Sequence, residues 1–135
     1  MKKTISILIC SIIIYGCELI IIGSKKTPQI EINQNTPIGA IYLFKTELDS
    51  NNIPAATQII AHPSGQQLLA LEKYELYDEV ERLGRLVRSR QITNVKADSL
   101  SERLYKINLE LDYNKLMYFT TAKIDDYWYI VSYSE

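Results

Sequence analysis

The sequence predicts an α+β domain in which helices come first and an antiparallel sheet follows. Up to about residue 88, apolar residues recur at steps of three, four and seven, which is the spacing of one helix face. From residue 104 onward apolar and polar residues alternate, as they do in a strand with one buried and one solvent-exposed face. Helices followed by a run of strands are typical of an α+β domain, whose helices pack on one face of the sheet.

Three helices are expected before the sheet. The first begins at Pro37, because the preceding Thr36 can cap a helix N-terminus and a proline at the first helical position lacks an N–H that would be unpaired there. The polar residues 49–52 end it, and Pro54 opens a short second helix. The longest helix is predicted over residues 66–88, where apolar residues follow one face and acidic residues gather early, as the helix dipole favours.

Four strands are expected after the helices. The first is weak, and the two-residue alternation then becomes clear from Leu104 to Tyr113. Short polar runs mark the turns between the later strands. The predicted strands are residues 92–98, 104–113, 116–124 and 127–133, with turns at residues 114–115 and 125–126. Strands joined in this order by short turns form an antiparallel meander.

The N-terminus carries an export signal. Lys2 and Lys3 precede an apolar run over residues 4–15, and a small residue follows, which is the layout of a secretory signal. The end of this run, Ile14-Tyr15-Gly16-Cys17, resembles a bacterial lipobox, in which an aliphatic, a variable and a small residue precede a cysteine. In that family the cysteine sulfur receives a diacylglycerol, the chain is cut before the cysteine, and the new amine is often acylated, for example with palmitate.

The lipobox resemblance implies three regions: a signal peptide over residues 1–16, a lipidated Cys17 with a tether to residue 35, and a domain over residues 36–135. Two or three acyl chains hold a protein stably at a membrane, so the domain would be anchored at the bacterial cell envelope. Glu18 follows the cysteine, whereas an aspartate there would favour the inner membrane, and we therefore expect the outer membrane.

Two alternatives to lipidation remain open. The apolar run continues beyond Cys17, so residues 4–23 are long enough to cross the hydrocarbon core of a membrane as an uncleaved helix. A plain secretory signal would instead release the domain after cleavage. All three interpretations export residues 36–135 from the cytoplasm.

The predicted order of elements resembles the nuclear transport factor 2-like (cystatin-like) cone fold over residues 36–132. Small bacterial lipoproteins of unknown function, some of them described as lumazine-binding-like, use this fold. Pro37, Ile41 and Phe44 resemble its opening helix, residues 49–56 its acidic turn into an alanine-rich second helix, and residues 123–130 its closing hairpin. The resemblance implies N-terminal helices packed on a curved, cone-like sheet. The fold hosts isomerases, dehydratases, ligand binders and interaction modules, so it does not select a function.

Composition excludes several function classes. Without residues 1–16 and their two lysines, the chain keeps 13 basic and 16 acidic residues, a net charge of −3. That balance does not favour nucleic-acid binding, which needs a strong basic excess. Cys10 and Cys17 are the only cysteines and His62 is the only histidine. We therefore predict no catalytic residues, no metal site and no cofactor in the domain.

Aromatic residues supply the candidate ligand site. Tyr74, Tyr77, Tyr118 and Trp128 would line the mouth of a cone and stack on a flat, largely apolar ligand. The alternative is that the tyrosines fill the core and cover the exposed face of the sheet, where tyrosine is common. The sequence thus favours a non-catalytic, membrane-anchored domain that binds a protein partner or a small apolar ligand.

Two other functions stay open. An isomerase or dehydratase of the cone type needs a buried carboxylate base, and Glu110 and Asp112 would serve only if the sheet curled round them. A structural or immunity-type surface protein would instead carry an exposed apolar patch on the sheet and no pocket.

Overall fold

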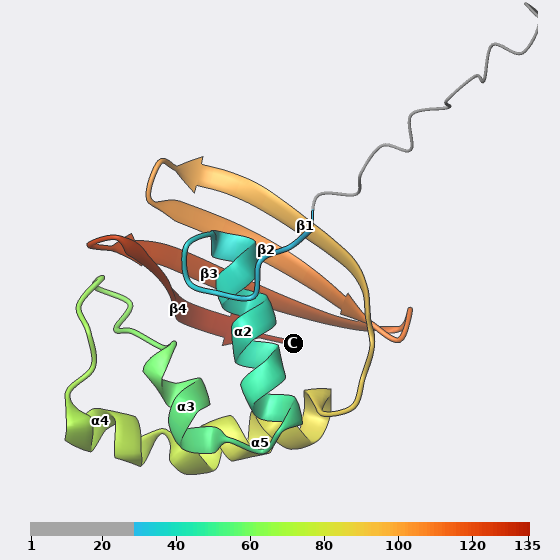
Figure 1. Ribbon diagram of the computed structural model, residues 1–135, viewed down its shortest axis with the longest axis horizontal. Coiled ribbons are helices and arrows are strands. Elements are labelled where there is room, and N and C mark those ends of the chain that lie inside the picture. Colours follow the sequence, from blue (N-terminus) through green and yellow to red (C-terminus); the bar gives the residue numbers. More distant parts are fainter. Residues whose placement is uncertain (1–28) are drawn as a thin grey trace, which may run out of the picture.

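The structure is a computed structural model that describes residues 29–135 (Figure 1). Cys17, the signal peptide and the first part of the predicted tether lie outside these residues. The elements are the helices α2 (Pro37–Asp49), α3 (Ile53–Gln58), α4 (Ala70–Glu75) and α5 (Tyr77–Val87), followed by the strands β1 (Ile92–Ser101), β2 (Leu104–Leu111), β3 (Lys115–Ile124) and β4 (Tyr127–Ser134). The predicted α+β class, with helices before the strands, is confirmed. Within residues 29–135, no helix is long and apolar enough to cross a membrane.

The four strands form an open antiparallel sheet in the order β1-β2-β3-β4, so β1 and β4 are its edges. The turn between β3 and β4 lacks a glycine, and Asp125 adopts the required positive φ of 52°. The strand predicted over residues 104–113 ends earlier, at Leu111. Asp112 turns the chain there, because its N–H donates to the Gln91 carbonyl (2.9 Å) and its carboxylate accepts from the Gln91 N–H (2.8 Å).

The single helix predicted over residues 66–88 is wrong: the structure has α4 and α5, separated at Leu76. The first residues are extended because Gln67 forms a bridge with Ala61, and the Gln66 carbonyl accepts from the His62 N–H (2.8 Å). The apolar spacing also misled, since α4 buries none of its residues, whereas α5 buries an apolar face. The apolar spacing is therefore the same along α4 and α5, although α4 is exposed and α5 packs against the core.

Helix α2 lies across the inner face of the sheet and forms the centre of the core (Figure 1). Thr36 caps it, as predicted, by accepting the Gly39 N–H on its hydroxyl oxygen (2.9 Å). The buried face of α2 carries Ile41, Phe44 and Leu48, and the Phe44 ring meets the Phe119 ring of β3 edge-on, with centroids 6.3 Å apart. The sheet contributes alternate residues to the same core: Ile107, Leu109, Leu111, Met117, Phe119, Trp128 and Ile130.

The chain before α2 is held against the domain, although residues up to 35 were predicted to be a tether. The Gln34 carbonyl accepts the Trp128 N–H (2.8 Å), and the Gln34 side-chain amide donates to the Trp128 carbonyl (3.0 Å). At Gly39 the backbone of this segment comes very close: a Cβ there would lie 2.5 Å from the Asn33 carbonyl oxygen. Glycine at this position lets the segment lie over the start of α2.

Two fully buried threonines, Thr57 and Thr121, provide a matched pair for stability (both 0% exposed). The Thr57 hydroxyl donates to the Pro54 carbonyl (2.8 Å), whereas that of Thr121 has no hydrogen-bond partner among the described residues. Thr121→Val should raise the free energy of unfolding by about 1 kcal/mol, because it removes an unpaired buried oxygen, and Thr57→Val should lower it by about 1 kcal/mol. Urea unfolding measures both, and equal losses in the two variants would contradict the prediction.

Candidate functional site

A cleft of about 430 Å³ lies between β4, the loop after α3 and the junction of α4 with α5. In Figure 1 the loop and α4 lie at the left of the molecule, below the start of β4. Three separate stretches of the chain contribute to the lining: Ile60, Ala61, His62 and Pro63; Leu68, Glu72, Glu75, Leu76 and Glu79; and Val131, Ser132 and Tyr133. The volume is in the range of small-molecule sites in proteins.

Backbone pairing fixes the upper wall of the cleft. The Ala61 N–H donates to the Ile130 carbonyl (2.9 Å), and the Ile130 N–H donates to the Ile59 carbonyl (2.9 Å), which makes a short parallel bridge to the edge of β4. The lower wall is fixed differently, because α5 is held by its buried apolar face. The cleft remains open between these two attachments.

The floor of the cleft is apolar and its rim is acidic. Ile60, Leu68, Leu76 and Val131 supply aliphatic surface. Glu72, Glu75 and Glu79 supply the charge, and among residues 29–135 no lysine or arginine lines the cleft. Because carboxylates repel an anion at close range, the cleft favours neutral or positively charged molecules over anions.

Tyr133 connects the floor to the rim. Its hydroxyl donates to the Glu79 carboxylate (2.6 Å). Burial raises the pKa of Tyr133 well above its ordinary value, and the hydrogen bond and the negative charge of Glu79 raise this pKa further, against a smaller opposite effect of Arg82. The hydroxyl therefore stays protonated and keeps its role as a donor in this wall. His62 also lines the cleft, with its Nδ1 atom 3.2 Å from the Ser64 hydroxyl oxygen.

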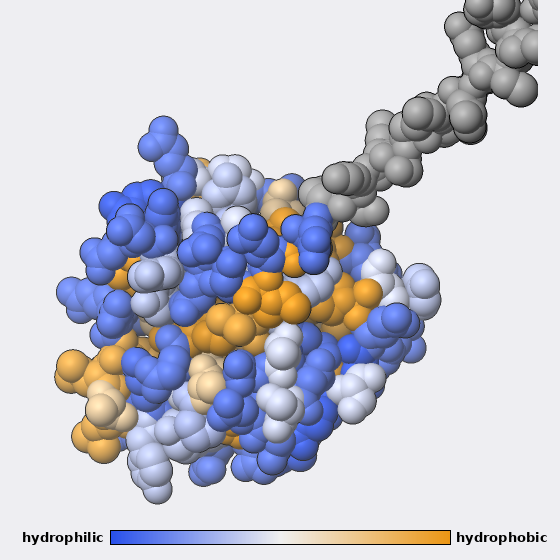
Figure 2. Space-filling view, viewed as in Figure 1, coloured by the Kyte–Doolittle hydropathy of each residue, from blue (hydrophilic) through white to orange (hydrophobic). Residues whose placement is uncertain are grey.

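Helix α4 and Leu69, the residue before it, add an exposed apolar surface beside the cleft. Leu69, Leu71 and Tyr74 are about 70%, 68% and 69% exposed. Figure 2 shows apolar atoms gathered at the left of the molecule, where α4 lies in Figure 1. Three large apolar side chains on two turns are more than the isolated exposed residues that most soluble proteins carry, and such a patch is typical of an interaction surface.

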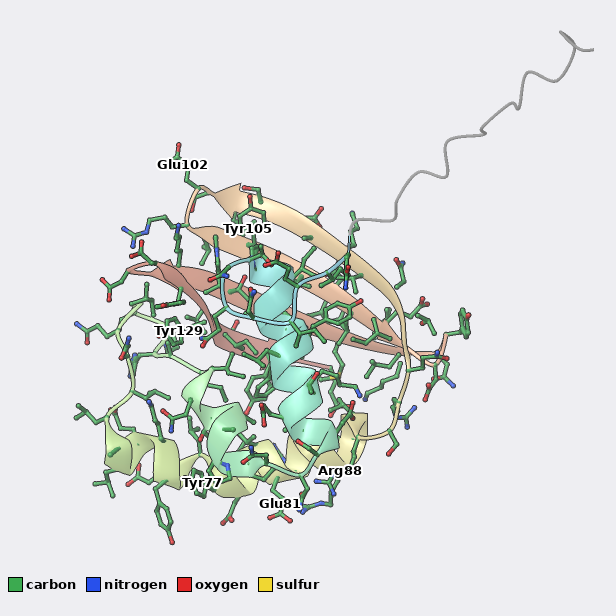
Figure 3. All side chains as sticks on the ribbon, in the orientation of Figure 1. Tyr77, Glu81, Arg88, Glu102, Tyr105 and Tyr129 are labelled. Atoms are coloured by element: carbon green, nitrogen blue, oxygen red, sulfur yellow. The ribbon has the colours of Figure 1, made fainter. Side chains whose placement is uncertain are left out.

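The structure does not bring the four predicted ligand-binding aromatics into one site. Tyr74 and Tyr77 lie together, with ring centroids 5.3 Å apart. Trp128 is 6% exposed in the core, edge-on to Tyr105, and Figure 3 shows Tyr105 at the opposite end of the molecule from Tyr77. Tyr118 alternates with the buried Met117 and Phe119, so it lies on the outer face of the sheet, where the Lys106 ammonium is 5.7 Å from its ring centroid.

The two candidate catalytic carboxylates also lie away from the cleft. The Thr93 hydroxyl donates to Glu110 (3.2 Å), and Asp112 forms an ion pair with Arg90 (3.4 Å) in addition to its bond to Gln91. These contacts join the start of β1 to the end of β2. Among residues 29–135, no three histidine, cysteine, aspartate or glutamate side chains are grouped so as to hold a metal ion.

Sequence reasoning missed the cleft because its walls come from stretches far apart in the chain. Nothing in the sequence pairs Glu79 with Tyr133 or places Leu68 and Val131 in the same cleft. The available signal was the breaker around His62, which separates the second helix from the third and therefore marks a place where the chain changes direction. No protein-family model matches the chain, and no curated protein matches it significantly.

The Tyr133 hydrogen bond predicts how stability depends on alkaline pH. Below about pH 10 the Tyr133 hydroxyl is neutral in both the folded and the unfolded chain. At higher pH it ionises first in the unfolded chain, because its pKa is raised in the folded chain, and the free energy of unfolding therefore falls. Tyr133→Phe removes this titration and, at pH 8, about 1 kcal/mol of hydrogen bonding. The wild-type excess in free energy of unfolding should therefore shrink between about pH 9 and about pH 11.5. The other tyrosines are present in both the wild type and the variant, so their titration does not affect the difference between the two free energies of unfolding. A difference that stays constant with pH would contradict the prediction.

Proposed function

We propose that this chain is a lipoprotein of the bacterial cell envelope, anchored by lipid at Cys17, whose non-catalytic domain binds a small, largely apolar ligand. The observation that carries the binding role is the cleft of about 430 Å³ with its aliphatic floor. Apolar surface buried in such a cleft drives binding, and a few polar groups at the rim orient the ligand. The glutamates restrict the ligand to neutral or positively charged molecules.

A protein partner is the second candidate, favoured by the exposed side chains of α4. Leu69, Leu71 and Tyr74 supply the leucine and aromatic surface that protein partners cover. In Figure 1, α4 lies at the opposite corner of the domain from the first residues that the structure describes.

The nuclear transport factor 2-like cone fold is part of the same proposal. The order of helices and strands supports it, as does the position of α2 across one face of the sheet. The chain departs from that family in the closing hairpin, where Asp126 and Tyr127 replace the usual turn glycine before the tryptophan and the positive φ falls on Asp125. The enzyme alternative receives less support, because Glu110 and Asp112 are not among the residues that line the cleft.

Ligand binding is tested with apolar dyes on a chain that begins at residue 29, since the whole core lies after that position. Nile red, which is neutral, should bind with a Kd on the order of micromolar, and anilinonaphthalene sulfonate, an anion, at least tenfold more weakly. Leu68→Asp should weaken Nile red binding at least tenfold, because it places a charge on the apolar floor.

Leu116→Asp is the matched control for the dye experiment. Leu116 is an exposed leucine on β3 that does not line the cleft, so the same change there should leave dye binding unaltered. Tighter binding of the anion, or equal losses in the two variants, would reject the cleft as the site. Fluorescence titration gives all the affinities.

Anchoring is tested by growing bacteria that express the full chain with labelled palmitate. The wild type should incorporate label and fractionate with the outer membrane, and Cys17→Ser should abolish both, because the serine oxygen does not receive the diacylglycerol. Cys10→Ser is the matched control and should retain the label, since Ile9 before it is not a small residue. Absence of label in the wild type would exclude lipidation at Cys17.

A further inference from the structure

Strand β1 is an open edge of the sheet. It pairs with β2 on one side, and among residues 29–135 no backbone group of residues 94–99 bonds to any other element. The register is regular from Asn94 to Ser99, with irregularities only toward the two ends of the strand, and β1 contains no proline. Long, regular edges can pair with another chain, and proteins usually protect them with charges, prolines or bulges.

The charges on this edge are arranged symmetrically about Ala97. Lys96 and Asp98 flank it and project from the solvent face of the sheet, with Lys96 Nζ 3.5 Å from Asp98 Oδ1. In an antiparallel pair of β1 strands related by a two-fold axis at Ala97, Lys96 of each copy lies directly opposite Asp98 of the other. Side chains in that position are close enough to attract each other.

We propose that two copies of this chain associate through β1, antiparallel and centred on Ala97, so that their sheets become continuous. The register is selected by charge. A two-fold axis at Lys96 would place Lys96 opposite its own copy, and an axis at Asp98 would place two aspartates opposite each other, both of which are repulsive. Only the axis at Ala97 places both Lys96 and Asp98 opposite a residue of the opposite charge on the second copy.

The neighbouring strand reinforces this register. Within one chain Asp98 is already opposite Lys106 of β2, and Lys96 is opposite the neutral Asn108. Pairing of two copies therefore places Asp98 between two lysines and supplies Lys96 with an opposing carboxylate. The result is a row of alternating charges across both sheets, which is the favourable arrangement for cross-strand neighbours.

The inner side of the same edge is apolar. Val95 and Ala97 are half-buried and pack against the core from this edge. An apolar groove of about 500 Å³ adjoins Ala97, and its walls include Ile30, Ile38 and Tyr105. Figure 2 shows apolar atoms in the middle of the face that contains the start of α2. A second β1 strand beside Ala97 would cover part of this surface, so association buries apolar area on one face and pairs charges on the other.

The test uses the full chain, purified in mild detergent, with sedimentation velocity to measure oligomeric state. The wild type should form dimers, and Lys96→Asp or Asp98→Lys alone should raise the dimer dissociation constant at least tenfold. Each single variant places like charges opposite each other at both symmetric contacts. A chain with both substitutions should dimerise more tightly than either single variant, because opposite charges again face each other across the axis. It should dimerise more weakly than the wild type, because Asp98→Lys places a positive charge opposite Lys106 of β2.

Mixing the two single variants gives the sharpest outcome. The Lys96→Asp chain carries acids at both positions and the Asp98→Lys chain carries bases at both, so the two should form a mixed dimer although neither dimerises alone. Glu81→Lys, an equal change of charge on the exposed side of α5, should leave the dimer intact. A monomeric wild type, or a dimer that neither single variant weakens, would overturn the proposal. Unfolding in urea confirms that the exposed substitutions leave the fold unchanged.

Discussion

The contact between α2 and the inner face of the sheet is the interaction on which the other elements depend. Phe44 and Phe119 meet at its centre, and truncation of such a buried aromatic costs about 3–5 kcal/mol, a large part of a small domain's stability. The end of α2 is then joined to the end of α5: the Arg88 side chain donates to the Leu48 carbonyl (3.2 Å), and the Asp49 carboxylate accepts from Lys45 (2.6 Å) and from the Ser89 N–H (3.0 Å). These bonds fix the position of α5 relative to α2.

The cleft lies between two segments of the chain that are attached to different parts of the domain. The segment around Ile60 is bonded to β4, and α5 is packed against α2 and α3, whereas α4, which lies between them in the chain, buries none of its residues. Helix α4 therefore lies outside the core with its leucines in solvent, and the space between α4 and β4 stays unfilled. Exposure of the apolar side chains of α4 and of the apolar cleft to water is energetically unfavourable. Binding of a ligand or partner at this place would account for that exposed apolar surface.

Local patterns were sufficient for the fold class and insufficient for the site. The cap at Thr36 and the alternation along β2 depend on neighbouring residues, and both were predicted from the sequence. The spacing of Leu69 and Leu76 fitted a helix face equally well, yet Leu69 is exposed, because burial depends on partners elsewhere in the chain. The same reason separates Tyr77 from Trp128 and joins Glu79 to Tyr133: side chains meet across the fold by topology, which a single sequence does not reveal.

The two hydrogen bonds between Gln34 and Trp128 have a mechanical consequence. Any pull on the N-terminal end of the domain reaches residue 34 before it reaches α2, and these bonds pass it to β4, which shares the load with β3 through their ladder. The backbone of Asn33, lodged over Gly39, resists lateral displacement at the same point. Tension on residue 34 is thus passed into the sheet at its β4 edge.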